Sequence, residues 1–195
     1  MCIEHWRQRG ITLIEQIVFI VIVSVGVVGL VSVMNASIRN SADPMLTKQL
    51  MAIAESVMSE VIHQPFTWCD PDDAHAATAT SNTISTTDIN QCHDTAQTTF
   101  GPTPATETRN GTAGNVFDNV ADYGGWDSTN EGANLTDAAG NNPMTGFSAV
   151  VAVANAGTSL GLADNSAALS ITVTVTYGAE TYSLTGYRFR YAPRY

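Results

Sequence analysis

An uncharged apolar run near the N-terminus constrains the fold of this chain more than any other feature. Residues 17–34 carry no charge, and only two serines and two glycines interrupt their valine, isoleucine, leucine, phenylalanine and methionine side chains. A helix of roughly 18–20 such residues is long enough to cross the hydrocarbon core of a bilayer. The run therefore predicts one transmembrane helix in a chain of 195 residues, which leaves room for one further domain of ordinary size.

The charges that flank the run predict its orientation. Arg7 and Arg9 precede it, whereas Arg39 is the only basic residue between the run and Lys48. The positive-inside rule accordingly places the N-terminus in the cytoplasm and the chain after residue 40 on the other side of the membrane.

A cleaved signal peptide and a simple signal anchor are the two ordinary interpretations of such a segment. A signal-peptide cut near Ala36 would put Met34 at a position that prefers a small residue. Neither interpretation explains Glu15, because an acid in an apolar membrane segment costs about 2–3 kcal/mol and needs a functional reason.

The composition excludes several classes of function. The formal net charge is −10, and after residue 64 thirteen acids face only four arginines. Nucleic-acid binding needs clustered lysine and arginine, so it is not expected here. The sequence also lacks the nucleophile-elbow, zinc-protease and phosphate-loop motifs, and we therefore expect neither enzymatic activity nor a cofactor.

Residues 9–15, Arg-Gly-Ile-Thr-Leu-Ile-Glu, resemble the processing motif of type IV prepilins. The resemblance implies that a prepilin peptidase removes residues 1–10 by cutting after Gly10 and then methylates the new amino terminus of Ile11. It also implies a filament-core helix over residues 11–41 and a head domain over residues 42–195. Glu15 would then neutralise the charged amino group of Ile11, in the same subunit or in a docked neighbour.

A second, amphipathic helix is predicted over residues 44–64. Asp43 and Pro44 favour a helix that restarts or kinks at this point. The apolar residues that follow recur every three or four positions and form a stripe that needs a sheet to cover it: Leu46, Leu50, Ile53, Val57 and Val61, widened by Met51, Ala54, Met58 and Ile62.

Alternating apolar residues predict an antiparallel sheet over residues 145–191. The expected strands are residues 147–154, 169–177 and 181–191. The last strand is expected to present five residues on one face: Tyr182, Leu184, Tyr187, Phe189 and Tyr191. The resulting fold class is α+β: a long N-terminal helix, membrane-spanning in its first half and packed on a C-terminal sheet in its second half, as the resemblance to pilins also implies.

Residues 66–142 are rich in small polar residues and predict an irregular, partly ordered insertion with short strands. Cys2 would leave with the leader, so Cys69 and Cys92 remain as an even pair in an oxidising compartment, which predicts a disulfide. The alternative, a reactive Cys92 with His93 as its base, requires a reduced and activated thiol.

Two groups of acids are weak candidates for a calcium site. Asp70, Asp72 and Asp73 lie close together with His75, but they lack the glycine and the distal glutamate of an EF-hand loop. Asp118 and Asp122 flank Asn119 in a second group. A solvated turn is the competing interpretation for both groups, and no metal is expected.

Scattered segments also resemble minor pilins of the mannose-sensitive haemagglutinin (MSHA) pilus, notably the Ala-Asp-Pro-Met of residues 42–45 and the Phe-Asp-Asn-Val-Ala-Asp-Tyr of residues 117–123. This resemblance implies a minor pilus subunit that supports adhesion and starts in the inner membrane. The implied partners are the prepilin peptidase, the major pilin, other minor pilins, the assembly platform proteins and membrane lipid. The alternative is a minor pseudopilin of a type II secretion system.

Overall fold

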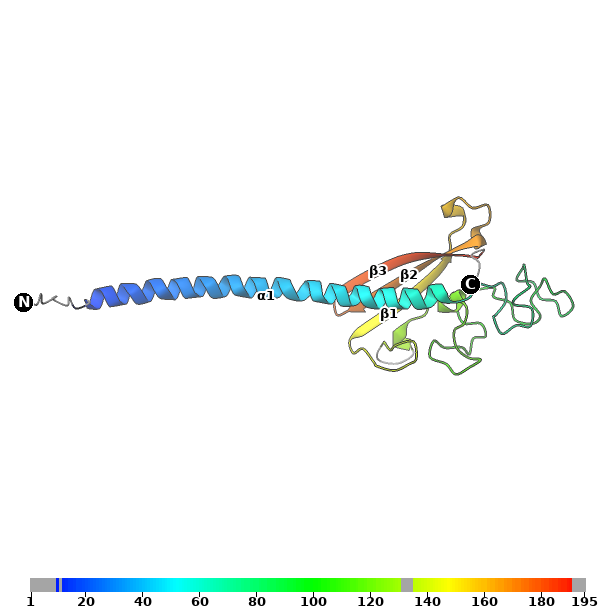
Figure 1. Cartoon of the computed structure of the whole chain (residues 1–195), viewed down its shortest axis with the longest axis horizontal. Helices are drawn as coiled ribbons and strands as arrows, with labels where there is room; N and C mark the ends of the chain where they lie inside the picture. The colour runs from blue at the N-terminus through cyan, green and yellow to red at the C-terminus, as the bar shows by residue number, and fades with distance from the viewer. Residues whose placement is uncertain (1–9, 11, 131–134, 191–195) are drawn as a thin grey trace, which may run out of the picture. The chain divides into compact units, whose positions relative to one another are not determined.

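The computed structural model describes residues 10, 12–130 and 135–190, with the backbone alone for residues 36–43. The chain divides into two compact units, residues 1–46 and 47–195. Helix α1, Leu13–His63, runs through both units, and the three strands of the sheet belong to the second (Figure 1). An apolar N-terminal helix and a C-terminal antiparallel sheet confirm the α+β class.

In the first unit, residues 13–35 of α1 satisfy their backbone groups within the helix and leave their side chains uncovered. Leu13–Asn35 is the one helix among the described residues that is long and apolar enough to cross a membrane, and none of its most apolar stretch is buried. Its valines, isoleucines and leucines are between 44% and 79% exposed.

The two helices expected over residues 11–41 and 44–64 are one element. Pro44 lies inside α1, and residues 42–46 remain helical. Of the two expected alternatives, a restart or a kink, the structure therefore does not have the restart. A proline removes one backbone hydrogen bond and crowds the preceding turn. The helical segments before and after Pro44 outweigh this local cost, because every further residue in a helix adds one backbone hydrogen bond.

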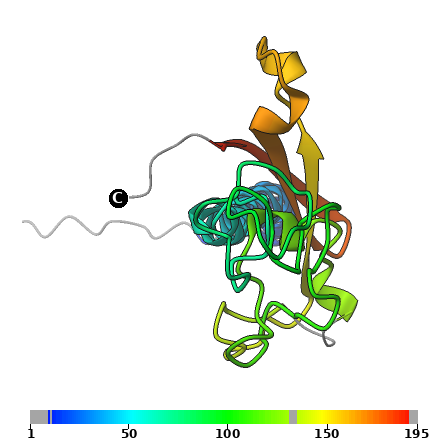
Figure 2. The ribbon, with the colours of Figure 1, turned by 90° about the vertical axis from the view of Figure 1, so that its right-hand side faces the viewer.

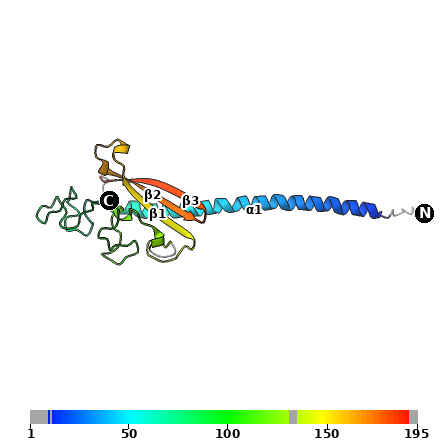
Figure 3. The ribbon, with the colours of Figure 1, turned by 180° about the vertical axis from the view of Figure 1, so that it is seen from behind.

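In the second unit, α1 covers one face of a three-stranded sheet ordered β1-β2-β3 (Figure 3). Strands β1 (Phe147–Asn155), β2 (Ala168–Tyr177) and β3 (Glu180–Phe189) are all antiparallel. The central strand β2 is the most buried, and its Ile171, Val173 and Val175 are fully covered. The helix contributes Leu50, Ala54, Val57, Met58 and Val61 to the same core, as the apolar stripe predicts.

The expected face of β3 is wrong for Tyr187 and Phe189, and Tyr191 lies outside the described residues. The register with β2 is continuous, so Tyr182 and Leu184 share the half-buried face with Gly186, whereas Tyr187 and Phe189 lie on the opposite, exposed face. The helix explains the choice of face. A Cβ at Gly186 would lie 3.0 Å from the sulfur of Met58 and 3.2 Å from Cδ1 of Ile62, so glycine allows α1 to approach the strand closely.

Most of residues 66–142 form loops rather than strands (Figure 2). Within the described part of this insertion, the regular elements are two short 3-10 helices, η1 (Val120–Tyr123) and η2 (Ser128–Asn130). The expected short strands are reduced to isolated bridges, such as Cys69 with Ala96 and Thr108 with Val116. One of the bridges, Asp127 with Val150, attaches the insertion to the free edge of β1.

Candidate functional site

The prepilin-like motif lies at the start of the exposed apolar helix. Gly10 is exposed, and Glu15 lies in the first turn of α1, where a carboxylate interacts favourably with the helix dipole. Ile11 and residues 1–9 of the expected leader lie outside the described residues. The structure thus describes two of the three motif residues to which a role is assigned.

The predicted disulfide is present. Cys69 and Cys92 are bonded, with their Cα atoms 5.4 Å apart, and both residues are fully buried. A bonded and buried Cys92 cannot act as a thiolate, so a nucleophilic pair with His93 does not fit this structure. The crosslink closes a segment that otherwise has little regular structure.

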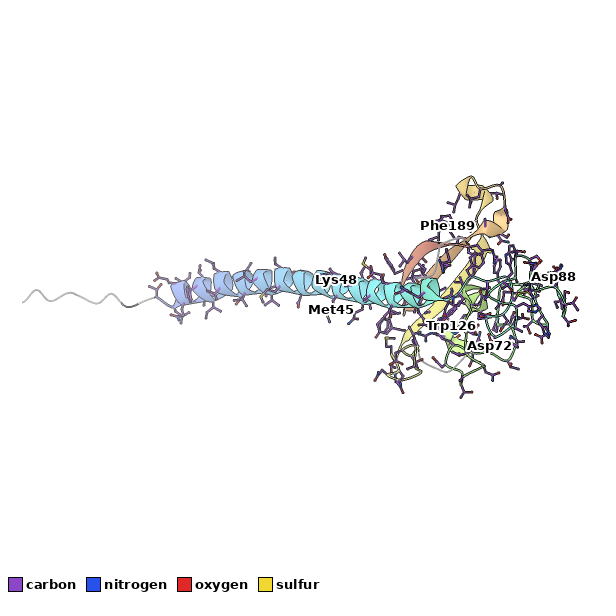
Figure 4. The ribbon with its side chains drawn as sticks, turned by 45° about the vertical axis from the view of Figure 1, so that its right-hand side comes forward. Met45, Lys48, Asp72, Asp88, Trp126 and Phe189 are labelled. Atoms are coloured by element: carbon purple, nitrogen blue, oxygen red, sulfur yellow. A yellow bond between two sulfur atoms is a disulfide. The ribbon has the colours of Figure 1, made fainter. Side chains whose placement is uncertain are left out.

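The structure separates the three neighbouring acids that the sequence groups together. Asp72 is exposed (Figure 4). Asp73 is buried, and its two carboxylate oxygens accept backbone N–H groups at 2.8–2.9 Å from four residues: His75, His93, Asp94 and Thr95. Burial alone would raise the pKa of Asp73, but these four hydrogen bonds lower it well below its usual range. Asp73 is therefore a loop-organising residue.

Asp70, by contrast, lies beside acids from two other segments. Ligand oxygens of Asp70, Glu107 and Asp118 all lie within 4.8 Å of one another. Asp70 and Glu107 are only 2% and 4% exposed, and Asp118 is half-buried. We call these three residues the acidic cluster. Asp122 lies next to it, since its Oδ2 accepts the N–H of Asp118 at 3.2 Å.

Backbone hydrogen bonds explain how the acidic cluster forms. The N–H groups of Thr108 and Phe117 bond to the carbonyls of Asn115 and Thr108, which places Glu107 beside Asp118. Val120 donates to the carbonyl of Pro65 at 2.9 Å, which brings the segment that contains Asp118 to the segment that leads into Asp70. Three distant parts of the sequence therefore meet at one point.

The electrostatics of this point are unfavourable for the protein alone. Burial, followed by repulsion from Asp122, Asp118 and Asp70, raises the pKa of Glu107 to about 8. Burial and then the charge of Asp70 raise the pKa of Asp118 to about 7. Burial also raises the pKa of Asp122 to about 6, against the effect of its backbone hydrogen bonds. In the protein alone, these carboxyl groups therefore keep their protons to a higher pH than ordinary carboxyl groups do, because ionising them together away from water is unfavourable.

A second buried polar group connects the insertion to the helix. Glu60 of α1 accepts two hydrogen bonds from Arg109, at 2.8 Å from Nε and 2.7 Å from Nη2, and a third from the hydroxyl of Tyr123 at 2.8 Å. Arg109 also bonds to the carbonyl of Thr136 at 3.1 Å and stacks on Trp126. These contacts make Glu60 and Arg109 a structural ion pair.

Sequence reasoning missed the acidic cluster because each of its members belongs to a different segment. Asp70 and Asp118 were assigned to two separate groups, and Glu107 was not considered. The available local signal was the Asn119 and Asp122 spacing, which forms a capping box on η1 and explains why Asp118 and Asp122 are held together. Nothing in the local sequence indicates that Asp70 joins them.

The structure therefore offers two separate candidates, one in each compact unit: an exposed apolar helix that begins beside a prepilin-like motif in residues 1–46, and the acidic cluster in residues 47–195. In comparisons with known proteins, no protein-family model, no curated protein and no solved structure matches the chain, so its function is argued from these residues.

Proposed function

We propose that the chain is a minor structural subunit of a type IV pilus of the MSHA kind, cut after Gly10 and incorporated into the filament through α1. The observation that carries this proposal is the uncovered apolar surface of Leu13–Asn35, which begins within the prepilin-like residues 9–15. A helix of this kind is stable only when lipid or other apolar helices surround it. A pilus subunit would meet this requirement twice: lipid would surround the helix before assembly, and the apolar helices of other subunits would surround it in the filament.

Glu15 has a definite role in this proposal. Cleavage would create an ammonium group at Ile11, four residues before Glu15 in the sequence. This is the sequence spacing at which two side chains can pair along a helix. Each charge reduces the cost of placing the other in an apolar environment. A subunit with both charges can enter a helical filament core, either paired within itself or paired with its neighbour.

The proposed location follows from the same residues. The arginines before the helix favour a cytoplasmic N-terminus in the inner membrane, and the disulfide is typical of an oxidising compartment beyond that membrane. After cleavage by the prepilin peptidase, the subunit would join the major pilin and other minor pilins at the assembly platform and become part of an extracellular, adhesive pilus.

Two substitutions test the proposal in the native host. We expect Gly10→Val to leave residues 1–10 attached, which mass spectrometry of the membrane fraction measures directly. We expect Glu15→Val to be cleaved and inserted normally but to be strongly depleted from sheared pili in quantitative immunoblots. Gln16→Val, a polar-to-apolar change at the next position, is the matched control and should be incorporated like the unchanged chain.

Two results would overturn the proposal. Either the Glu15→Val and Gln16→Val chains are recovered from purified pili in equal amounts, or the unchanged chain and both variants are all absent from the pili. A deletion strain separates the pilus from the secretion alternative. Loss of surface pili or of adhesion supports the pilus subunit, whereas retained pili with loss of an exported enzyme identifies a minor pseudopilin of a type II secretion system.

A further inference from the structure

Four carboxylate oxygens in the head are buried without any hydrogen-bond partner. They are Oδ2 of Asp70, Oε2 of Glu107, Oδ1 of Asp118 and Oδ1 of Asp122. A buried carboxylate normally accepts hydrogen bonds or pairs with a cation, because removing it from water is otherwise very costly. Asp70, Glu107 and Asp122 are each at least 96% buried, so bulk water does not fill these positions.

We propose that the acidic cluster of Asp70, Glu107 and Asp118 binds a calcium ion, with Asp122 beside it as a further source of negative charge. The geometry supports one shared ion. Ca²⁺ binds oxygens at about 2.3–2.6 Å, so two oxygens on the same ion are at most about 5 Å apart. The ligand oxygens of the three residues all lie within 4.8 Å of one another, inside this limit.

The chemistry of the ligands favours calcium over other metals. The three residues offer only carboxylate oxygens, which suit hard cations, and the cluster contains none of the nitrogen or sulfur ligands that zinc prefers. Magnesium demands shorter and nearly octahedral coordination and usually keeps most of its water. Calcium accepts irregular oxygen cages and either one or both oxygens of each carboxylate, which suits acids presented by loops.

The position of the ion gives it a structural role that does not depend on the filament assignment. Asp70 follows the disulfide residue Cys69, Glu107 comes from the middle of the insertion, and Asp118 precedes η1. An ion at this point connects three loop segments that share little other regular structure. Binding of the ion should therefore stabilise the folded head and protect the insertion from proteases.

The test uses the full-length chain in detergent micelles, stripped of metal with EGTA and then supplied with CaCl₂. Equilibrium dialysis with ⁴⁵Ca should give one tightly bound ion per chain. At a free calcium concentration of about ten times the dissociation constant, the melting temperature of the head should rise by about 3–6 °C. Magnesium at the same concentration should produce a clearly smaller shift.

Two variants, Glu107→Gln and Asp118→Asn, separate ion binding from folding. Each removes one of several repelling buried charges, so each variant should melt at the same or a higher temperature than the EGTA-treated unchanged chain. Each should nevertheless lose the bound ⁴⁵Ca and the calcium-induced shift. Asp164→Asn is the matched control: Asp164 is exposed and caps the short 3-10 helix η4 (Asn165–Ala167). Asparagine caps equally well, and calcium binding should be unchanged.

The proposal is overturned if the EGTA-treated unchanged chain binds no calcium, since the acids then share protons instead of an ion. It is equally overturned if Glu107→Gln and Asp118→Asn keep the full calcium shift, because the ion then binds elsewhere, or if magnesium stabilises the chain as strongly as calcium.

Discussion

Glu60 is the side chain through which the helix holds the insertion. It lies on the half-buried side of α1 and accepts hydrogen bonds from both Arg109 and Tyr123. Arg109 is almost completely buried, with 3% of its side chain exposed. Pairs of this kind contribute little when compared with an apolar replacement, but removing the carboxylate charge of Glu60 takes the paired negative charge away from the buried guanidinium of Arg109.

We therefore expect Glu60→Gln to lower the free energy of unfolding of the head by about 3–5 kcal/mol. Glu55→Gln, the same change at an exposed position of the same helix, is the control and should alter it by less than about 0.5 kcal/mol. Urea unfolding of the full-length chain in micelles, followed by tryptophan fluorescence, measures both. Equal effects of the two substitutions would show that the buried pair does not hold the insertion.

Asp73 predicts a specific dependence of stability on pH. Its pKa is lower in the folded chain than in the unfolded chain, so its ionised form stabilises the fold. This contribution is complete at pH values above the unfolded pKa of about 4, and it decreases as the pH falls below that value. The four backbone N–H groups that it accepts lose their charged partner upon protonation.

We expect Asp73→Asn to cost about 1–3 kcal/mol at pH 7, because one amide oxygen cannot replace two carboxylate oxygens as acceptors. The difference from the unchanged chain should shrink as the pH falls from 5 to 2, and the other acids, common to both chains, cancel in this comparison. Thermal unfolding across this pH range measures it. The exposed neighbour provides the control, Asp72→Asn, which should show no such convergence; a constant difference for Asp73→Asn would contradict the interpretation.

At the scale of elements, the insertion is the part of the head that most depends on covalent and ionic connections. Its apolar anchors, Phe117, Tyr123 and Trp126, are all at most 6% exposed. Most of the remaining segment is held by turns and isolated bridges, which bury little surface. Ordering each such residue costs about 1–2 kcal/mol of backbone entropy, so the crosslink between Cys69 and Cys92 has a large share in the stability of this region.

Replacing both cysteines by serine should lower the stability of the head by roughly 3 kcal/mol, the value for closing a loop of this length in the chain-entropy model. The double variant should melt lower, and limited proteolysis should cut within residues 66–142 before it cuts the sheet. Cys2→Ser leaves the crosslink intact and serves as the control. An unchanged melting temperature in the double variant would show that packing alone holds the insertion.

At the scale of the whole molecule, the regular elements could be predicted from the sequence and the loop architecture could not. The apolar run and the alternation of Ile171, Val173 and Val175 with threonines are local patterns that reflect lipid exposure or burial directly. The face of β3 was mispredicted because the aromatic side chains of Tyr187 and Phe189 suggested burial. In a strand without a bulge, alternate residues share a face, so Leu184 lies on the same face as Gly186, which α1 approaches closely, and Tyr187 lies on the other face.

The acidic cluster and the Glu60–Arg109 pair were beyond prediction for the same physical reason. Glu60 and Arg109 are 49 residues apart in the sequence, and nothing near either one marks it as buried. Asp70 and Glu107 likewise meet only because turns and bridges fold the insertion back on itself. Polar contacts between irregular segments leave no periodic pattern, whereas apolar faces of helices and strands do.

The uncovered surface of Leu13–Asn35 has a consequence for how the chain can exist in a cell. Folding buries the core of the sheet but leaves the apolar side chains of this helix uncovered. The concentration of free chain in water is therefore limited by the poor solubility of the helix and not by the stability of the sheet. Water without lipid or detergent is therefore a poor solvent for the full-length chain, however stable the sheet and its insertion are.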